Sequence, residues 1–259
     1  MHLVVDVGNT ETVIGLFAPN CLEVLADRRY ATVTPRTSDE LLLLIRTLLQ
    51  EAGHSHEAVD RTVLGSVVPV QTEILLRTLA SVGTGDVFVL DGEDGLPVRL
   101  DVEEPPQGVG ADRIANTLAA AHLYQRDTIV VDLGTATTYD CITADGVFCG
   151  GVIAPGLLAG EEWLAGRTAK LPRVSFRRPE RVIGRRTEDC LQSGVFFSSV
   201  DAVDGIIERI REEWNRPGAH VVATGGHAMT VAPHSRLVEK VAPHLTLVGL
   251  EIAGDHLSG

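Results

Sequence analysis

Lysine is almost missing from this sequence of 259 residues, in which it occurs only as Lys170 and Lys240. Neither lysine follows a glycine-rich turn, and the pattern G-x-x-x-x-G-K-[ST] does not occur. That pattern places a lysine on bound phosphates, so its absence excludes P-loop chemistry. Any phosphate bound here must be neutralised by other groups.

Cationic charge as a whole is scarce. The sequence has 22 lysines and arginines and 35 aspartates and glutamates, which gives a formal net charge of -13. An acidic surface repels phosphate backbones and anionic lipids, so we expect no nucleic-acid partner and no membrane partner.

Paired cysteines and long apolar runs are also lacking. The four cysteines have no C-x-x-C spacing, which excludes common zinc motifs and favours reduced thiols. The first residues do not resemble a signal peptide, and no uninterrupted apolar run approaches about 18 residues. The sequence therefore predicts a cytoplasmic protein.

Short apolar segments alternate with helical ones along the chain, which is typical of an α/β protein. The first two strands are joined by a Gly/Asn turn, and Ser38 is the expected N-cap of a helix over 41–49. We expect strands at 3–7, 12–17, 22–32, 62–68, 86–90, 128–131, 146–153, 221–226 and 245–252. We expect further helices at 71–82, 114–125, 157–169 and 188–214, the last as one helix or two abutting ones.

A repeat divides the sequence near its middle. Residues 3–8 (LVVDVG) match residues 129–134 (IVVDLG) with an offset of 126, and Thr12 then matches Thr138. The repeat predicts two similar α/β halves. We place their boundary after the glycine- and proline-rich stretch 91–110, which gives an N-terminal ATP-binding domain at 1–115 and a C-terminal domain at 116–259.

The repeated strand–turn units carry groups suited to phosphate. Asp6 supplies a carboxylate, Gly8 lets backbone N–H groups approach a ligand, and Asn9 and Thr10 add donors. Such a turn suits a magnesium–polyphosphate complex, although a polar β-turn without a ligand has the same composition. Because the turn occurs twice, we expect the two hairpins to face each other across a cleft and to hold a triphosphate. Asp132 in the second turn is the candidate ligand of a further cation.

A second motif lies between the two hairpins. Asp112 stands at the entrance of an alanine-rich helix and is followed by Arg113. An aspartate here is often only an N-cap. A small-molecule kinase, however, needs a carboxylate that accepts a hydroxyl proton and an arginine that binds a carboxylate or phosphate.

These motifs together resemble the type III pantothenate kinases of the actin and sugar-kinase superfamily. The matching segments follow the family's order over almost the whole chain: 6–10 (DVGNT), 66–69 (SVVP), 110–116 (GADRIAN), 132–138 (DLGTATT), 150–156 (GGVIAPG), 183–187 (IGRRT), 192–194 (QSG), 224–226 (TGG) and 245–250 (LTLVGL). The resemblance implies two ribonuclease H-like domains with a cleft between them. It also implies ATP-dependent phosphorylation of pantothenate at its primary hydroxyl, the first step of coenzyme A biosynthesis.

The resemblance also implies site residues. Asp112 corresponds to the general base, and Asp132 corresponds to the ligand of a potassium or ammonium ion. The implied substrate-binding residues are Gly110, Ala111, Asp112, Arg113 and Thr187. The implied ATP-binding residues are Asp6, Val7, Gly8, Asn9, Thr10, Glu11, Thr12, Val13 and Thr135, with Mg²⁺ on the nucleotide. The resemblance further implies a homodimer.

The chain departs from the family pattern at three positions. Glu103 stands where many members carry a tyrosine, and Ser198 and Asp201 stand where glycines are usual. Two other functions fit the motifs: a regulator that binds nucleotide without turnover, and a phosphatase or phosphotransferase with another substrate. Retention of Asp6, Asp112 and Asp132 favours the kinase over the regulator, because binding alone needs no base.

Overall fold

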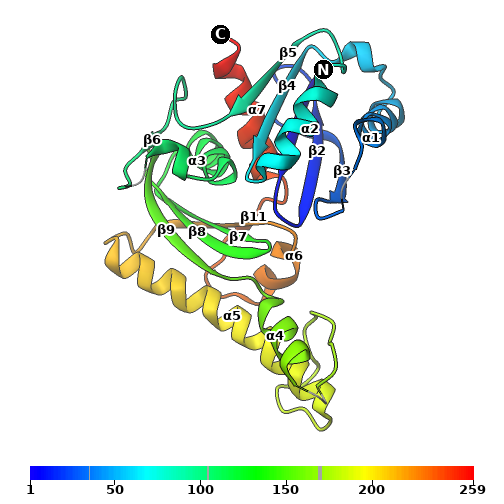
Figure 1. Cartoon of the computed structure of the whole chain (residues 1–259). Helices are drawn as coiled ribbons and strands as arrows, with labels where there is room; N and C mark the ends of the chain where they lie inside the picture. Colours follow the sequence, from blue (N-terminus) through cyan, green and yellow to red (C-terminus); the bar gives the residue numbers. More distant parts are fainter. Residues whose placement is uncertain (35, 104, 169–170) are drawn as a thin grey trace. The chain divides into compact units, whose positions relative to one another are not determined.

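The computed structural model describes residues 1–34, 36–103, 105–168 and 171–259 (Figure 1). By their contacts these residues form two compact units. The first unit comprises residues 1–125, 143–149 and 244–259, and the second comprises residues 126–142 and 150–243. The division of the sequence into domains at residue 115 stays a prediction.

The first unit is built on a five-stranded sheet with the order β3-β2-β1-β4-β5. The hairpin strands β1 and β2 are antiparallel, whereas β1, β4 and β5 run parallel. The carboxyl ends of these three strands therefore meet at one edge of the sheet. The strands are β1 (His2–Val7), β2 (Glu11–Phe17), β3 (Val24–Ala31), β4 (Arg61–Ser66) and β5 (Asp86–Leu90).

Two helices of the first unit share an apolar core with one face of this sheet. Leu41 and Ile45 of α1 (Ser38–Glu51) and Leu75 of α2 (Pro69–Leu79) belong to a fully buried cluster with the β1 side chains. The N-cap of α1 is Thr37, one residue before the predicted Ser38. Thr37 and Glu40 form a capping box, which satisfies two orphan N–H groups at the helix start.

The other two long helices of this unit, α3 (Ala111–Tyr124) and α7 (Leu245–Leu257), pack against each other and against β1 and β4 (Figure 1). The contact is close, because a Cβ on Gly249 would lie 1.9 Å from the Ala115 carbonyl oxygen. The prediction of a strand over 245–252 is therefore wrong. Residues 245–254 are buried on every side, so their apolar run lacks the helical period that would reveal a half-exposed helix.

The second sheet has the order β11-β10-β7-β8-β9-β6. As in the first unit, a hairpin of antiparallel strands (β7 and β8) lies beside a strand parallel to its first member (β10). This shared connectivity confirms the predicted repeat. The strands are β6 (Arg99–Leu100), β7 (Thr128–Leu133), β8 (Ala136–Ile142), β9 (Val147–Pro155), β10 (His220–Thr224) and β11 (Lys240–Val241), of which β6 and the start of β9 belong to the first unit.

The strand register corrects one detail of the repeat. Val7 pairs with Thr12 in the first hairpin, and Leu133 pairs with Thr137 in the second. Thr137, not Thr138, is therefore the counterpart of Thr12, because the second turn is one residue shorter.

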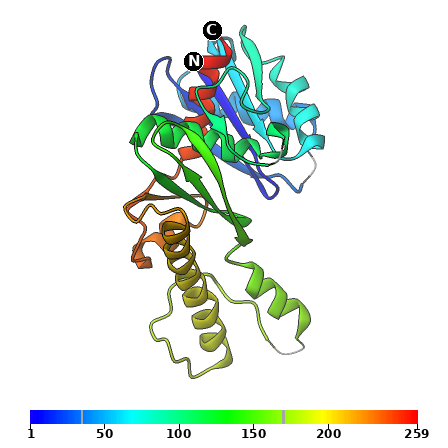
Figure 2. The same cartoon turned by 90° about the vertical axis from the view of Figure 1, so that its left-hand side faces the viewer.

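Helices α4 (Ala159–Arg167) and α5 (Thr187–Glu213) of the second unit contact each other (Figure 2). The segment 188–214 thus forms one helix, and the predicted end of the helix over 157–169 lies outside the described residues. Within the described part of the chain, α5 alone is long and apolar enough to span a membrane, a test that core helices of soluble proteins also pass. The remaining helical segments are α6 (Ala228–Val231) and three 3₁₀ turns, His56–Ala58, Pro106–Gly108 and Ala232–His234.

Candidate active site

The turn between β1 and β2, hereafter the phosphate turn, stands at the carboxyl edge of the first sheet. The Gly8 amide donates to the Glu11 carbonyl oxygen at 3.0 Å, and the residues between them are exposed. Thr12 is buried, and its hydroxyl lies 2.8 Å from the Thr32 hydroxyl. Within the first unit, the exposed Asn9, Thr10 and Glu11 and the half-buried Asp6, Gly8 and Val13 are the members of the predicted ATP-binding set that a ligand could reach. Val7 and Thr12 are buried, and Thr12 anchors the turn.

The start of α3 lies next to this turn. Asp6 on β1 pairs in register with Gly65 on β4, and a Cβ on Gly65 would lie 3.6 Å from the Ala111 Cβ. The structure thus brings two predicted groups, the phosphate turn and residues 110–113, to the same sheet edge within one unit. Ligands of α/β proteins bind outside such carboxyl ends.

Asp112 occupies the second helical position of α3, and the N-cap is Gly110. The alternative in which Asp112 serves as the N-cap is therefore wrong. Its Oδ1 accepts a hydrogen bond from the Arg113 amide at 2.9 Å. Burial raises the pKa of the Asp112 carboxyl, and this effect exceeds the lowering by the Arg113 amide and guanidinium. A carboxylate with a raised pKa is a better proton acceptor near neutral pH.

Gly110 leaves room for this carboxylate. A Cβ on Gly110 would lie 2.4 Å from Asp112 Oδ1 and 3.4 Å from Val67 Cγ1. The backbone of Gly110 has φ -58° and ψ 142°, which any residue can adopt. The requirement for glycine is therefore steric, and it comes from the carboxylate that folds back over the helix start.

Arg113 is held by an aromatic ring. Its guanidinium lies 4.9 Å from the centroid of Phe148, which is 1% exposed. A cation over an aromatic face is attracted by the ring quadrupole. Sequence reasoning missed Phe148, because nothing in an apolar strand segment marks a residue that will contact position 113.

A cavity of about 510 Å³ opens at the same edge of the first unit. Its lining contains Glu73 and Asp91 but no lysine or arginine among the described residues. Glu103, at the position of the family's tyrosine, is exposed and does not line the cavity. The lining residues come from the ends of β4 and β5 and the starts of α2 and α3, and they include Ser66, Val67, Thr72, Leu90, Gly110 and Ala111.

The second hairpin has a comparable turn in the second unit. A Cβ on Gly225, which has φ +88°, would lie 2.4 Å from Asp132 Oδ1, and a Cβ on Gly156 would lie 2.0 Å from the Thr135 carbonyl oxygen. Two glycines thus leave a space beside a carboxylate and backbone carbonyls. Oxygen donors of this kind suit a hard cation, so the residues fit the predicted role of Asp132. Thr135 is exposed at the tip of the turn.

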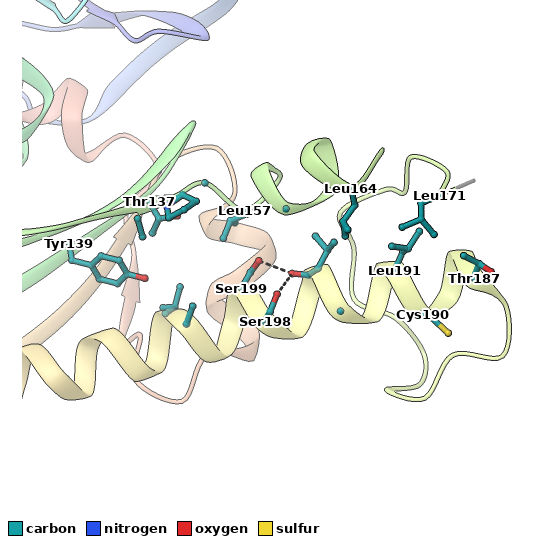
Figure 3. A pocket seen from close by; sticks show the side chains of 18 residues that line it. Thr137, Tyr139, Leu157, Leu164, Leu171, Thr187, Cys190, Leu191, Ser198 and Ser199 are labelled. Carbon is teal, nitrogen blue, oxygen red and sulfur yellow. Dashed lines mark hydrogen bonds between the residues drawn. The ribbon is translucent and has the colours of Figure 1, made fainter. Parts of the chain in front are cut away.

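Thr187, the remaining predicted substrate residue, is the first residue of α5 and lines a cavity of about 540 Å³ within the second unit (Figure 3). The lining is mostly apolar, with Leu157, Leu164 and Leu191 around it. Ser198 also lines this cavity, and its hydroxyl donates to the Val195 carbonyl oxygen at 3.3 Å.

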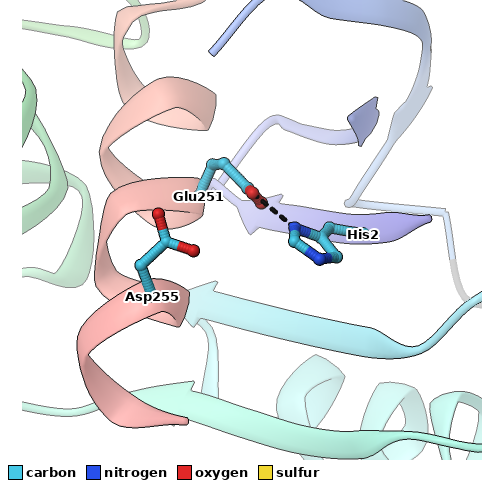
Figure 4. Close-up of side chains that lie close together, drawn as sticks. All are labelled: His2, Glu251 and Asp255. Atoms are coloured by element: carbon cyan, nitrogen blue, oxygen red, sulfur yellow. Dashed lines mark hydrogen bonds and ion pairs between the residues drawn. The ribbon is translucent and has the colours of Figure 1, made fainter. Parts of the chain in front are cut away.

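A third cluster joins the chain termini of the first unit. His2 Nδ1 lies 2.5 Å from Glu251 Oε1, and Asp255 lies nearby on the same helix (Figure 4). These three side chains could hold a metal ion by spacing alone. The Arg61 guanidinium, however, already lies 2.7 Å from Glu251 and 2.6 Å from Asp255. The Arg61 guanidinium therefore already supplies the positive charge that a metal ion would bring to these carboxylates.

Comparison with known proteins identifies relatives along the whole chain. A family model described as type III pantothenate kinase matches residues 2–209. The type III pantothenate kinase of Geobacter sulfurreducens is 41% identical over 254 residues, which cover 97% of each chain. That of Moorella thermoacetica is also 41% identical over 254 residues, covering 97% of this chain and 98% of the other.

Solved structures agree at the level of the fold. The ROK hexokinase of Thermus thermophilus aligns with a TM-score of 0.54 at 15% identity, covering 99% of each chain. The ethanolamine utilization protein EutJ of Carboxydothermus hydrogenoformans aligns with a TM-score of 0.57 at 18% identity, covering 96% of this chain and 88% of the other. The fold is thus the predicted α/β fold of the actin and sugar-kinase type. Because the family match spans most of the sequence and the relatives align over nearly their full length, the chain belongs to the type III pantothenate kinase family.

Proposed function

We propose that this protein phosphorylates pantothenate with ATP to give 4'-phosphopantothenate, the first step of coenzyme A biosynthesis, with Asp112 as the general base. One observation carries the catalytic assignment: the carboxyl edge of the first sheet places the phosphate turn beside the start of α3, where Asp112 has a raised pKa. A phosphate-binding turn next to a buried carboxylate is the minimum that phosphoryl transfer requires of a protein.

The nucleotide binds through backbone and hydroxyl groups. The proposed contacts in the first unit are Asp6, Val7, Gly8, Asn9, Thr10, Glu11, Thr12 and Val13, with Thr12 acting through its anchoring bond to Thr32. The family resemblance adds Thr135, which is exposed in the second unit, as a further proposed contact.

Pantothenate binds at the start of α3. Gly110 and Ala111 line the cavity of the first unit, whereas Asp112 and Arg113 do not, so the proposed substrate lies at the helix start beside this cavity. Arg113, which lies over Phe148, pairs with an anionic group of the substrate. The family resemblance adds Thr187, which lines the separate cavity of the second unit.

The reaction is an in-line displacement. The primary hydroxyl oxygen of pantothenate attacks the γ-phosphorus of ATP while the bond to the β,γ-bridging oxygen breaks, and ADP leaves. Asp112 accepts the hydroxyl proton and later passes it to water. The raised pKa of Asp112 brings its basicity closer to the working pH, which favours proton transfer in the transition state.

Bound cations and a helix N-terminus balance the charge on the phosphates. Lys240 lies exposed on β11, and Lys170 lies outside the described residues. Asp6 would hold Mg²⁺ through water, and Asp132 with the neighbouring carbonyls would hold K⁺ or NH₄⁺. When bound, these cations neutralise charge that builds up on the phosphate oxygens. The N-terminus of α3 adds the positive end of a helix dipole beside the reacting group.

A homodimer in the cytoplasm completes the proposal. The second unit exposes several large apolar side chains. They are Ile153, Trp163, Val182 and Ile183, each at least 62% exposed. A second copy of this chain is the partner that the family resemblance implies, and these side chains are candidate contacts for it.

A coupled assay of ADP release tests the function. With ATP, Mg²⁺ and K⁺, we expect ADP release only when pantothenate is added, together with a product heavier by one phosphoryl group. ATP binding without release would favour the regulator, and pantothenate-independent release would favour a phosphatase or another phosphotransferase.

Replacing K⁺ with Na⁺ should weaken ATP binding, because Asp132 is the proposed ligand of the monovalent cation. Equal ATP affinity in both salts would argue against a cation site at Asp132.

A further inference from the structure

The turn between β4 and α2, formed by Ser66–Pro69, has no part in the reaction described above. It nevertheless touches both halves of the candidate site in the first unit. The Val67 amide donates to the Val7 carbonyl oxygen at 3.1 Å, at the base of the phosphate turn. The Val67 side chain and the Asp112 carboxylate both approach the space where a Cβ on Gly110 would lie. Val67 therefore contacts the base of the phosphate turn through its backbone and the start of α3, beside Asp112, through its side chain.

Two hydroxyl groups fix the conformation of this turn. Ser66 Oγ accepts from the Val68 amide at 3.1 Å and from Thr72 Oγ1 at 2.7 Å. The N-cap of α2 is Val68, which has no side-chain oxygen to cap the helix. Ser66 therefore satisfies the Val68 amide from outside the helix, and Thr72 reaches back from inside it to hold Ser66 in place.

Of the two threonines on α2, Thr72 pairs with the Ser66 hydroxyl and Thr78 does not. Thr72 and Thr78 lie on the same helix, and each hydroxyl lies within hydrogen-bond distance of the carbonyl four residues earlier, at 3.1 Å and 2.9 Å. Such bonds are common for threonine in helices. Thr72 additionally contacts Ser66 and lines the cavity with Val67, whereas Thr78 is buried away from that cavity.

We propose that Ser66 and Thr72 are positioning residues for the phosphoryl transfer: their hydroxyl pair holds Val67 against Val7 on one side and Gly110 on the other. This keeps the phosphate turn and the Asp112 carboxylate at a fixed separation. The proposal rests on the proposed function. Misplacing a reacting group by about 1 Å can cost roughly 100-fold in rate, so a device that sets this separation acts on the turnover rate.

The test compares three variants of the full-length protein in the pantothenate-dependent assay. Thr72→Val keeps the shape of the side chain but removes the hydroxyl, Thr72→Ser retains the hydroxyl, and Thr78→Val is the matched control on the same helix. We expect kcat to fall about 10-fold or more for Thr72→Val, with little change in KM for ATP. Thr72→Ser should restore most of the rate, and Thr78→Val should leave it unchanged.

The pH profile separates positioning from simple loss of stability. When Val67 withdraws, water reaches the Asp112 carboxyl, so the acid limb of kcat should move to lower pH in Thr72→Val. A variant that unfolds more easily in urea but keeps the wild-type kcat and acid limb would overturn the proposal. If Thr72→Val does not fold, Ser66→Ala gives the same comparison. Absence of product with the wild type overturns the proposed function and this inference together, whereas an unaffected variant overturns this inference alone.

Discussion

Asp112 is the residue on which stability and catalysis conflict. Burial raises the pKa of its carboxyl, so the folded protein disfavours the ionised form that a base must have. A group with a raised folded-state pKa contributes stability that is present below its unfolded-state pKa and lost as the pH rises through the folded-state value. At neutral and higher pH, the ionised carboxylate is therefore a cost to folding.

We expect Asp112→Asn to be more stable than the wild type at pH 8, because an amide cannot ionise. Each gain of 1 kcal/mol in the free energy of unfolding should raise Tm by about 2–4 °C in a protein of this size. The difference should shrink as the pH falls, since the wild-type carboxyl then becomes protonated. Thermal unfolding at pH 8 and pH 5 measures both effects, and a lower Tm for the variant at pH 8 would refute this reading of the site.

Gly110→Ala tests the steric contact at the same helix start. The added Cβ would meet the Asp112 carboxylate at 2.4 Å, while the backbone dihedrals of Gly110 suit alanine. We therefore expect a folded protein whose kcat falls by up to about 100-fold, because the carboxylate must turn away. Gly218→Ala is the control, since its added Cβ would meet nothing within 4 Å. Equal turnover in both variants would show that the carboxylate orientation is unimportant.

At the scale of elements, α7 is tied to β1 and β4 by a buried ionic cluster. Glu251 is 1% exposed and is held by Arg61 and His2. Burial raises the pKa of Glu251 even with these partners present. Removing the cation leaves a carboxylate that water cannot solvate.

Arg61→Met should therefore lower the free energy of unfolding by about 3–5 kcal/mol at neutral pH. The deficit should shrink as the pH falls, because protonation of Glu251 removes the unpaired charge. Urea unfolding at pH 7.5 and pH 5.5 measures it. Arg77→Met is the control: Arg77 pairs with Glu73 on the surface of α2, where the loss should stay under about 1 kcal/mol. A deficit that does not depend on pH would argue against an unpaired Glu251 charge.

Individual elements also show which parts of the fold and of the site the sequence could predict. The Gly/Asn turn predicted the first hairpin, and the repeated strand with its glycine turn predicted the second, because local turn chemistry favours both. The apolar run of α7 predicts a strand, because a helix that is buried on all sides lacks the helical spacing of apolar and polar residues. The contact between Arg113 and Phe148 and the hydrogen bond from the Val67 amide to the Val7 carbonyl oxygen depend on which segments become neighbours. Segments that lie together only after folding leave no local pattern, so these contacts could not be predicted.

At the scale of the whole molecule, the proposed homodimer makes the exposed Trp163 of α4 a candidate contact between the two copies. We expect the protein to sediment as a dimer at micromolar concentration. Trp163→Glu should weaken the dimer by about tenfold or more, because Trp163 is 62% exposed in the single chain and tryptophan is a frequent hot spot. Sedimentation at several concentrations measures this. A wild type that stays monomeric throughout would exclude the dimer.

The account as a whole depends on Asp112 accepting the proton of the pantothenate hydroxyl. The most direct measurement is kcat of Asp112→Asn beside the wild type, with MgATP affinity determined for both proteins. We predict that kcat falls by roughly 10²–10⁴-fold, the usual loss for a missing general base, while MgATP affinity stays the same. Turnover equal to that of the wild type would contradict the account.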